Sequence, residues 1–572
     1  MSGLLFCPEA PIEPTTFDLI VIGTGIPGSV IAAAASAVGK TVLHLDPNPF
    51  YGSHFASLPP NDLTSFLNSH STDHITTATT INTTTSIDPS VDHDYIAIDL
   101  KPRLLYSNIE TAAYAPEILE KHCPKEFTID LGGPRLLFPA DKATEILMKS
   151  GLNLYVECGF LVFNSIGAIF VCDESGQLRN IPHSRIELFK DRSLSLKEKT
   201  MLTRFFKFLE HYSEASRGIG GDQEGSHNSE SSKISEEELE TPFVDFINRM
   251  QLPPKIKLII HCIAMVDQDD LEVCKSKLKT RDGLERLALY HSSRSTNAHG
   301  PWIYPKYGHG DLSAAFARRA AVKGCIDALE RPVIAVLMDK DSGQYKGVRL
   351  ASGQDLFSHQ LVLDPTFTVT LAPTSSPPNL LRADLQVLSL KDDKGKVARG
   401  ICITASSLKP DISNCVLVCP PRSLCPDQDT SIRIIQICGG LETGVCPKGM
   451  FLLYFSALCD NAEQGKRLLH AVQNALLTLP MSGNPERAST VQSEKAEVKP
   501  TLLWSTLYIQ ELTMDQHDYL ISTPMPDGNL CYNDLLDATV LLFQKLYPNE
   551  EFFPETPLLE NLEDDIPINL ED

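Results

Sequence analysis

Residues 17–57 read FDLIVIGTGIPGSVIAAAASAVGKTVLHLDPNPFYGSHFAS, and this stretch decides the fold. The apolar-dominated run Asp18–Ile22 is typical of a buried parallel strand. A glycine-rich turn, the helical run Ser29–Val38 and a second β run, Thr41–Leu45, follow it. Strand, tight turn, helix and strand in this order form the βαβ unit of dinucleotide-binding folds.

The turn carries glycines at G-x-G-x-x-G spacing, and the second strand ends on an acidic residue. These four positions are Gly23, Gly25, Gly28 and Asp46. The glycines let the backbone turn sharply, and the helix that follows offers free N–H groups to a phosphate. A carboxylate about 20 residues further on is placed for a ribose hydroxyl. The pattern predicts the fold and leaves open whether a ligand is bound.

The segment after Asp46 bears on the ligand. Flavoenzymes with this opening usually continue into a Gly-Gly-Arg segment, whereas residues 46–54 read DPNPFYGSH, with one glycine and no arginine. This combination resembles the Rab GDP-dissociation inhibitor and Rab escort protein superfamily, which keeps a flavoprotein-like fold without the flavin. The resemblance implies that FAD binding is lost and that no cofactor is present. Family members commonly have an acidic residue where this chain has Gly28.

A second block, GPWIYPKYGHGDL at residues 300–312, reads as a short strand, a glycine turn and the start of a helix. Asp311 and Arg318 lie seven residues apart and share one helix face, which alone would suggest a capping acid and a solvated arginine. The block resembles the superfamily motif Tyr-Pro-x-Tyr-Gly-x-Gly-Glu-Leu, with Asp in place of Glu. The resemblance implies a Rab-binding platform formed by Tyr51, Asp311 and Arg318, to which we add Tyr307 of the same motif.

Between these blocks the sequence favours helices. Apolar residues recur at helical spacing in 196–212, and 258–266 is apolar all round, as expected at the centre of a bundle. HCIAM in that run resembles the central domain II helix of Rab escort proteins, where the family places the prenyl group of the GTPase. An ordinary bundle core explains the same residues. Transferase docking in the family uses an aromatic residue of this domain, for which Phe205 and Phe208 are candidates unless both belong to the core.

We therefore predict an α/β fold: a flavoprotein-like (FAD/NAD(P)-binding, Rossmann-type) multi-sheet domain with an inserted all-α helical domain. Segments poor in apolar residues predict disordered insertions. The predicted boundaries are 15–184 and 289–550 for domain I, 185–288 for helical domain II, 61–92 and 213–240 for the insertions, and 555–572 for an acidic tail.

Composition limits the partners. The net charge of −23 argues against nucleic acid and favours either a partner with basic segments or solubility alone. Without a run of 18 apolar residues or a signal-like N-terminus, we expect a cytosolic chain that makes only transient membrane contact. The 15 cysteines read as reduced thiols, and no spacing indicates a metal site.

Near the C-terminus, WSTLY at 504–508 and the segment 532–554 resemble the escort branch of the superfamily. That branch implies a non-enzymatic component A of Rab geranylgeranyltransferase. It would bind unprenylated Rab GTPases in the GDP form, present them to the αβ transferase, shield the geranylgeranyl lipid and deliver Rab to membranes. The alternatives are a Rab GDP-dissociation inhibitor and, from another class, a flavin-dependent oxidoreductase.

Overall fold

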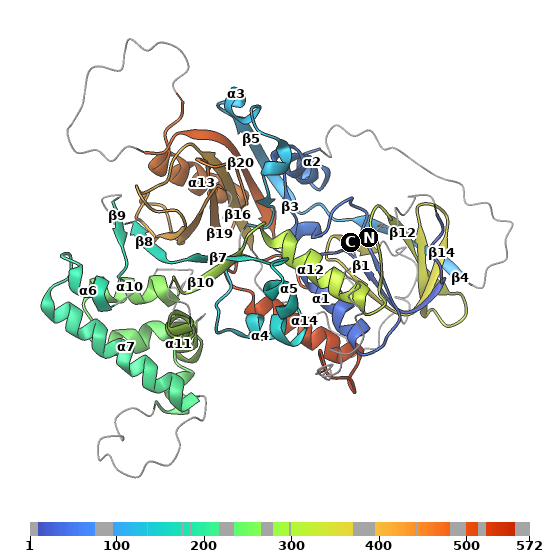
Figure 1. Cartoon of the computed structure of the whole chain (residues 1–572), viewed down its shortest axis with the longest axis horizontal. Helices are drawn as coiled ribbons and strands as arrows, with labels where there is room; N and C mark the ends of the chain where they lie inside the picture. The colour runs from blue at the N-terminus through green and yellow to red at the C-terminus, as the bar shows by residue number, and fades with distance from the viewer. Residues whose placement is uncertain are drawn as a thin grey trace, which may run out of the picture.

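A computed structural model of the chain describes residues 10–74, 95–133, 135–172, 177–182, 185–216, 234–264, 278–296, 299–369, 395–440, 444–480, 499–512 and 522–554. Within these residues the fold contains two eight-stranded sheets, and a group of helices projects beside the second sheet (Figure 1). The predicted fold class, a multi-sheet α/β domain with an inserted helical domain, is confirmed.

The first sheet contains the predicted βαβ unit. β1 (Thr16–Ile22) pairs in parallel with β2 (Val42–Leu45) on one side and with β14 (Asp355–Leu363) on the other. All of β2 is buried, as expected for a strand covered on both faces. The strand order is β11–β2–β1–β14–β13–β12–β4–β15, with antiparallel pairing beyond β14. The remaining strands are β4 (Tyr95–Pro102), β11 (Ile326–Ala328), β12 (Val333–Asp339), β13 (Tyr345–Leu350) and β15 (Phe367–Val369).

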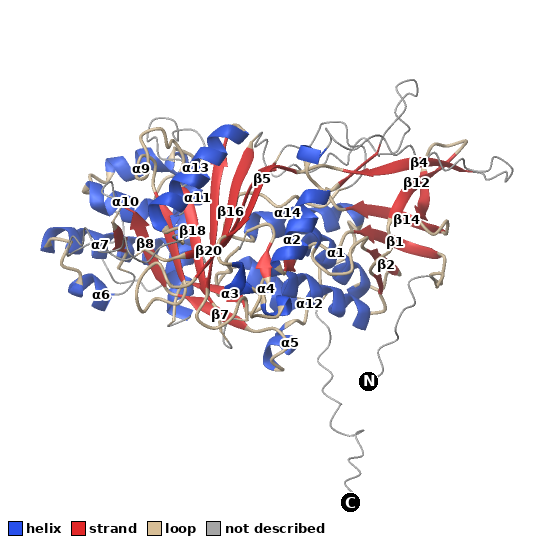
Figure 2. Cartoon of the chain, turned by 90° about the horizontal axis from the view of Figure 1, so that it is seen from above, coloured by secondary structure: helices blue, strands red, loops and turns tan. Residues whose placement is uncertain are grey.

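Three helices lie between the two sheets (Figure 2). α1 (Ile26–Ala37) follows the glycine turn directly, and its run of four alanines is fully buried. These small side chains let neighbouring helices approach closely, and α1 contacts both α12 (His309–Val322) and α14 (Asn533–Leu546). This packing fixes α12, the helix that carries Asp311 and Arg318.

The second sheet is mostly antiparallel and has the order β5–β20–β16–β19–β18–β17–β8–β9. Only β17 and β8 pair in parallel. α13 (Ala462–Leu476) packs on β16, β19 and β20, and its buried leucines close one face of the sheet. The strands are β5 (Tyr106–Ala113), β8 (Ala168–Cys172), β9 (Leu178–Asn180), β16 (Lys396–Thr404), β17 (Cys415–Cys419), β18 (Ile432–Cys438), β19 (Phe451–Cys459) and β20 (Leu502–Glu511).

Short elements join the sheets. β3 (Ser57–Leu58) pairs with β6 (Ile129–Asp130), and β10 (Trp302–Pro305) pairs with β7 (Phe163–Ile166). Both pairs are antiparallel, and they lie next to the start of α12 in the chain or in space. The other short elements are η1 (Ser53–Phe55), α2 (Pro60–Ser69), η2 (Thr72–His74), α3 (Pro116–Leu119), η3 (Pro124–Glu126), α4 (Lys142–Lys149) and α5 (Asn153–Glu157).

The helical domain is organised around its last helix. α11 contacts α7, α8, α9 and α10, so the all-apolar run expected at the centre shares that place with α11. Since α11 continues to Thr296, the domain ends later than the predicted 288. Its helices are α6 (Arg185–Lys190), α7 (Leu196–Ser216), α8 (Glu236–Leu239), α9 (Phe243–Arg249), α10 (Pro254–Ala264) and α11 (Thr280–Thr296).

The predicted insertion 61–92 is wrong over its first part. Residues 60–69 form α2, which buries Leu63, Phe66 and Leu67. These three residues have the i, i+3, i+4 spacing of one helix face, a signal that the Ser/Thr-rich composition around them obscured. Residues 75–94 lie outside the described part of the chain.

The second predicted insertion, 213–240, is wrong at both ends. α7 extends to Ser216, and α8 places Leu239 in the core. A short apolar anchor such as Leu239 is invisible to an average over composition. Residues 217–233 lie outside the described part, as does the acidic tail 555–572.

Candidate functional site

The four fingerprint residues come together where β1 meets α1. Gly23 has a φ of +98°, which L side chains rarely adopt, and a Cβ on Gly28 would stand 2.4 Å from the Gly23 carbonyl oxygen. Gly23 and Gly28 are therefore required by the backbone itself. Their presence carries no information about a ligand.

The space against this turn is filled by the chain. A Cβ on Gly23 would lie 2.8 Å from a carboxyl oxygen of Asp364, and one on Gly25 would lie 3.2 Å from the Phe55 ring. Asp364 follows β14 and accepts hydrogen bonds from the N–H and hydroxyl of Thr366 at 3.0 and 2.6 Å. Burial raises the pKa of Asp364 to about 6. A dinucleotide would place its pyrophosphate against such a turn, where a carboxyl group now lies.

Asp46 is also turned inward. One of its oxygens accepts the N–H and hydroxyl of Thr24, both at 2.7 Å. The other accepts the backbone and side-chain N–H groups of Asn48 at 2.9 and 2.8 Å. Asp46 is completely buried, and these four bonds use both oxygens, so no acceptor is left for a ribose. The residues around the fingerprint do not fit FAD.

Tyr51, Asp311 and Arg318 occupy one surface between the glycine turn and α12. Arg318 is exposed, while Tyr51 and Asp311 are half-buried. Burial raises the pKa of Tyr51 to about 12, and the nearby Asp327 adds to this while Arg318 opposes it. Burial also raises the pKa of Asp311, again opposed by Arg318. The structure brings the three residues together, and their role in binding stays a prediction.

Asp311 has a feature that the sequence does not show. Its Oδ2 atom is buried and makes no hydrogen bond within the described chain. A buried acceptor without a donor costs about 1–3 kcal/mol, which a donor supplied by a bound partner would recover. The surface therefore offers an acceptor at Asp311 and a charged donor at Arg318.

His44 supports this surface and was missed by the sequence analysis. Its Nδ1 lies 2.8 Å from Asp327 Oδ1 and its Nε2 lies 3.1 Å from the Gly23 carbonyl oxygen. Burial alone would lower the pKa of His44, but the bond to Asp327 and its charge outweigh burial and raise it. Because both partners accept, the ring donates from both nitrogens. Within the apolar strand VLHL, a lone histidine gave no signal of this role.

A second buried network fixes the start of α12. Asp130 accepts hydrogen bonds from the Ser57 hydroxyl, the Tyr304 hydroxyl and the backbone N–H of His309 at 2.5, 2.6 and 2.9 Å. Burial lowers the pKa of His309 to about 4, so its ring is neutral and its Nε2 accepts the backbone N–H of Arg135 at 2.6 Å. These bonds hold the helix end from which Asp311 projects.

Tyr307, the fourth predicted platform residue, lies between β10 and α12. Its side chain is 46% exposed, and Lys306 Nζ lies 5.4 Å from the centre of its ring. Tyr307 packs beside Gly444, where a Cβ would come within 2.5 Å of the ring. No contact between Tyr307 and the other three platform residues is present in the described structure.

The two transferase candidates lie in the aromatic core of the helical domain. Phe205 is 2% exposed and packs against Phe206 and Phe208, with ring centres 6.3 and 6.2 Å apart. Phe205 as a docking residue is therefore wrong in this structure, because its ring is out of reach of a partner. Phe208 is half-buried against Phe246. Consecutive aromatics on α7 did not reveal which of them pointed inward.

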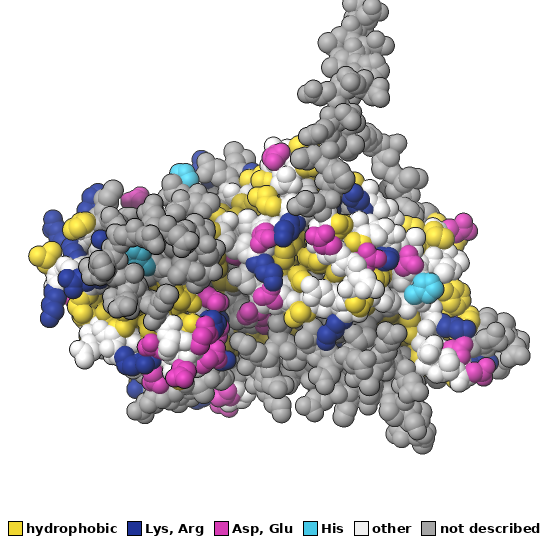
Figure 3. Space-filling view, turned by 90° about the horizontal axis from the view of Figure 1, so that it is seen from below, with side chains coloured by type: hydrophobic (Ala, Val, Ile, Leu, Met, Phe, Trp, Pro, Cys, Tyr) yellow, Lys and Arg dark blue, Asp and Glu magenta, His cyan; other side chains and the backbone are white. Residues whose placement is uncertain are grey.

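The exposed apolar residues of this domain lie instead where α6 leads into α7. Phe189 is 68% exposed and Leu196 is 76% exposed. Lys190, Arg192 and Lys197, all exposed, surround them. In the space-filling view, Lys and Arg side chains gather with apolar ones at the end of the molecule formed by this domain (Figure 3). We call these five residues the α6–α7 corner.

No group of described side chains is arranged to hold a metal ion. None of the described helices has both the length and the apolar character needed to cross a bilayer.

The profile of the family described as GDP dissociation inhibitor matches residues 13–111 and 97–479. The chain belongs to the GDP dissociation inhibitor family. This confirms the superfamily that the blocks at 46–54 and 300–312 indicated.

Among relatives of this GDP dissociation inhibitor family member, Rab escort protein 1 of Arabidopsis thaliana is 48% identical over 96% of this chain and 95% of that protein. Rab proteins geranylgeranyltransferase component A 2 of Mus musculus is 24% identical over 96% and 98%. The crystal structure of a Rab GDI from Plasmodium falciparum aligns with a TM-score of 0.59, 17% identity, and coverage of 94% of this chain and 99% of that one. This structural match shows a shared fold.

Proposed function

We propose that this protein is a Rab escort protein: it binds unprenylated Rab GTPases in the GDP form and presents them to Rab geranylgeranyltransferase. The observation that carries the proposal is the 48% identity to a Rab escort protein over nearly the whole of both chains. A relative described as a probable GDP dissociation inhibitor, from Schizosaccharomyces pombe, is 25% identical over 78% of this chain. The closer and longer match favours the escort activity over the inhibitor activity.

Rab would bind on the platform formed by Tyr51, Asp311 and Arg318, with Tyr307 at its margin. Arg318 is exposed and can pair with an acidic side chain, while the unpaired Asp311 oxygen can accept a hydrogen bond. The buried network around Asp130 holds the start of α12, so the platform is formed before the partner arrives. Such preorganisation lowers the entropy lost on binding.

The lipid would be sheltered by the helical domain. About 20 carbons of isoprenoid, at roughly 0.8 kcal/mol per buried CH₂, have to be kept from water between the transferase and the membrane. The core of this domain is aliphatic and aromatic and is built from short helices around α11. Apolar contacts are non-directional, and neighbouring short helices can shift to admit a chain.

The protein would act as a non-catalytic component A that holds no FAD. Support for this comes from the Asp364 carboxyl and the Phe55 ring, which occupy the space against the glycine turn, and from the four hydrogen bonds that use Asp46. The visible absorbance spectrum of purified protein tests this point. A flavin band would favour the oxidoreductase alternative. The cytosolic location and transient membrane contact expected from the sequence remain part of this proposal.

A reconstituted prenylation assay tests the escort activity. Purified αβ transferase, geranylgeranyl diphosphate and unprenylated Rab-GDP are incubated with and without the full-length chain, and lipid on Rab is measured. We expect prenylation only when the chain is present. If Rab stays unmodified while the chain extracts prenylated Rab-GDP from membranes, the protein is an inhibitor of GDP dissociation and the escort proposal fails.

The α6–α7 corner provides the docking surface we propose for the transferase. An exposed aromatic side chain surrounded by charged ones is a frequent anchor of protein interfaces. Phe189→Ala and Phe208→Ala should each be compared with Leu541→Ala, which removes an exposed apolar side chain on α14 in domain I. We expect Phe189→Ala to weaken assembly with the transferase at least tenfold and Leu541→Ala to leave it unchanged. A loss of assembly with Phe208→Ala alone would return the docking surface to α7.

A further inference from the structure

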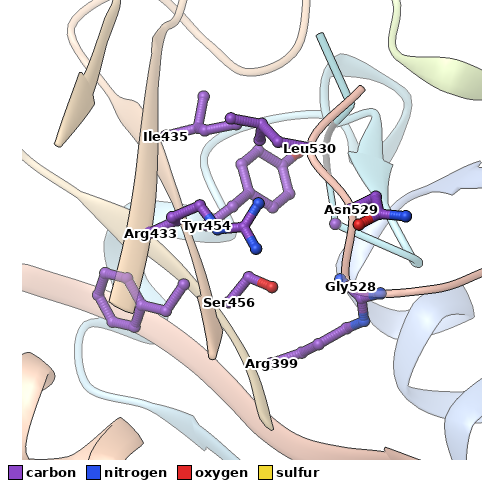
Figure 4. Close-up of a pocket in the computed structure, with 10 residues that line it drawn as sticks. Arg399, Arg433, Ile435, Tyr454, Ser456, Gly528, Asn529 and Leu530 are labelled. Carbon is purple, nitrogen blue, oxygen red and sulfur yellow. The ribbon is translucent and has the colours of Figure 1, made fainter. Parts of the chain in front are cut away.

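A small cavity lies between the second sheet and the segment that follows β20. Its volume is about 20 Å³, above the roughly 10–15 Å³ that one ordered water needs. Arg399 and Arg433 line it together with Ser456, Tyr454 and Gly528 (Figure 4). The two arginines are only 4% and 8% exposed, which is unusual for charged side chains.

The sheet register explains why the arginines face each other. Arg399 on β16 and Arg433 on β18 both pair with Ser456 on β19, the strand between them. The three residues therefore lie side by side across one face of the sheet, with the small serine in the middle. Neighbouring strands are about 4.8 Å apart, so the two arginine backbones are separated by about 10 Å. The short Ser456 side chain leaves the space between the guanidinium groups open.

The opposite wall approaches closely because it is built from glycines. A Cβ on Gly133, where φ is +70°, would stand 2.6 Å from Arg399 Nη1. A Cβ on Gly528 would stand 2.9 Å from Leu458 Cδ2. Arg399 donates from Nε to Gln510 Oε1 and from Nη2 to the Asp527 carbonyl oxygen, both at 2.6 Å. These bonds fix the guanidinium and leave Nη1 towards Gly133 and the cavity.

The charges around the cavity do not balance. Arg135, which is also buried, forms an ion pair with Asp527, and Asp527 further accepts the backbone N–H of Asn529 at 2.8 Å. Burial lowers the pKa of Arg433 to about 10, and Asp527 opposes that shift while Arg135 adds to it. Burial likewise lowers the pKa of Arg399, and the same two residues act in the same senses. Three buried guanidinium groups thus share one nearby carboxylate, whereas buried charges are ordinarily matched.

We propose that this cavity is a binding site for a small inorganic oxyanion of the size of phosphate, held between Arg399 and Arg433 above Ser456. Guanidinium groups bind oxyanions with paired, charge-assisted N–H···O hydrogen bonds, which chloride cannot reproduce. The bound anion supplies the missing negative charge and joins β16 and β18 to the 527–530 segment. Through Arg135, whose backbone N–H donates to His309, the site is connected to the start of α12.

Phosphate titration of the full-length protein tests the site. Thermal unfolding is followed as phosphate replaces chloride at constant ionic strength, because phosphate also stabilises proteins by a general, non-saturating effect. A specific site gives a saturable rise in the midpoint of unfolding. Two variants remove the site by different means: Arg433→Gln removes a charge, and Ser456→Val fills the space without changing charge. Arg204→Gln, which removes an exposed charge on α7, is the matched control.

We expect saturable stabilisation in the wild type and in Arg204→Gln, with the phosphate midpoint raised at least tenfold in both site variants. Equal titration curves in all four proteins, or no saturation in the wild type, would overturn the proposal. Crystals of the wild type grown without phosphate or sulfate and soaked in selenate give a test that does not depend on variant folding. An anomalous peak between Arg399 and Arg433 supports the site, and peaks elsewhere only, the sign of an adventitious ion only, contradict it.

Discussion

At the base of the platform, Asp130 accepts three hydrogen bonds from fixed donors, whereas in the helical domain Phe205 is surrounded by other aromatic rings. Hydrogen bonds are directional and hold atoms in one geometry. Apolar contacts depend on area and shape and tolerate small shifts of neighbouring helices. The first region suits a preformed protein surface, and the second suits a flexible lipid chain.

The largest expected effect comes from opening the aromatic core. Phe205→Ala leaves a cavity among Phe206, Phe208 and the helices of the domain, and we expect it to lower the free energy of unfolding by about 3–5 kcal/mol. Phe189→Ala removes an exposed ring from the same domain and should change stability by less than about 0.5 kcal/mol. Chemical denaturation of both variants checks the difference. Equal stabilities would place Phe205 outside the core.

The glycine turn gives the next effect, through Asp364. Burial raises its pKa in the folded protein to about 6, from 3.8 for an ordinary Asp, so between these pH values the folded state binds more protons than the unfolded state. Stability contributed by this group is therefore greatest at or below about pH 4 and falls as the pH rises towards 6.

Asp364→Asn keeps an acceptor for Thr366 and removes the ionisation. We expect the variant to be more stable than the wild type by about 1–3 kcal/mol at pH 8, with the advantage shrinking at pH 4. Asp339→Asn is the opposite control, because its partner Lys346 lowers the pKa of Asp339 and the variant should gain nothing at pH 8. Urea unfolding across this pH range checks both. A wild-type advantage at pH 8 would mean that Asp364 is ionised and needed.

On the platform, Arg318→Ala should change binding rather than folding. If Arg318 is desolvated against Rab, its loss should weaken binding of Rab-GDP by about 1–3 kcal/mol, while stability stays within about 0.5 kcal/mol because the side chain is exposed. Lys323→Ala at the end of the same helix removes an exposed charge away from the platform. Calorimetric titration with Rab-GDP measures both. An unchanged affinity for Arg318→Ala would remove Arg318 from the proposed interface.

The sequence predicted those parts of the molecule that follow from local pattern. The βαβ unit was legible because Gly23 and Gly28 are required by the turn itself, and the platform because two motifs carry it. Asp364 and His44 were not legible: Asp364 reaches the turn from β14, more than 300 residues along the chain, and His44 looks like any residue of a buried strand. Phe205 shows the remaining limit, because helical spacing predicts that residues share a face without saying what covers it.

Tyr51→Phe should have the smallest effect and is the sharpest test of the platform. Because burial, together with Asp327, raises the pKa of Tyr51 to about 12, the hydroxyl keeps its proton at neutral pH and is available as a donor. Removing a single neutral hydrogen bond to a partner should weaken Rab binding by about 0.5–1.5 kcal/mol, with little change in stability.

The double variant with Arg318→Ala decides whether the two residues act together. Arg318 affects the pKa of Tyr51, so the two groups are electrostatic neighbours, and a shared Rab contact should make their binding losses non-additive by at least about 0.5 kcal/mol. Calorimetry on the four proteins of the cycle measures the coupling. Additive losses would mean that Tyr51 and Arg318 contact separate parts of Rab, and a loss of stability in Tyr51→Phe would mean that its hydroxyl serves the fold rather than the partner.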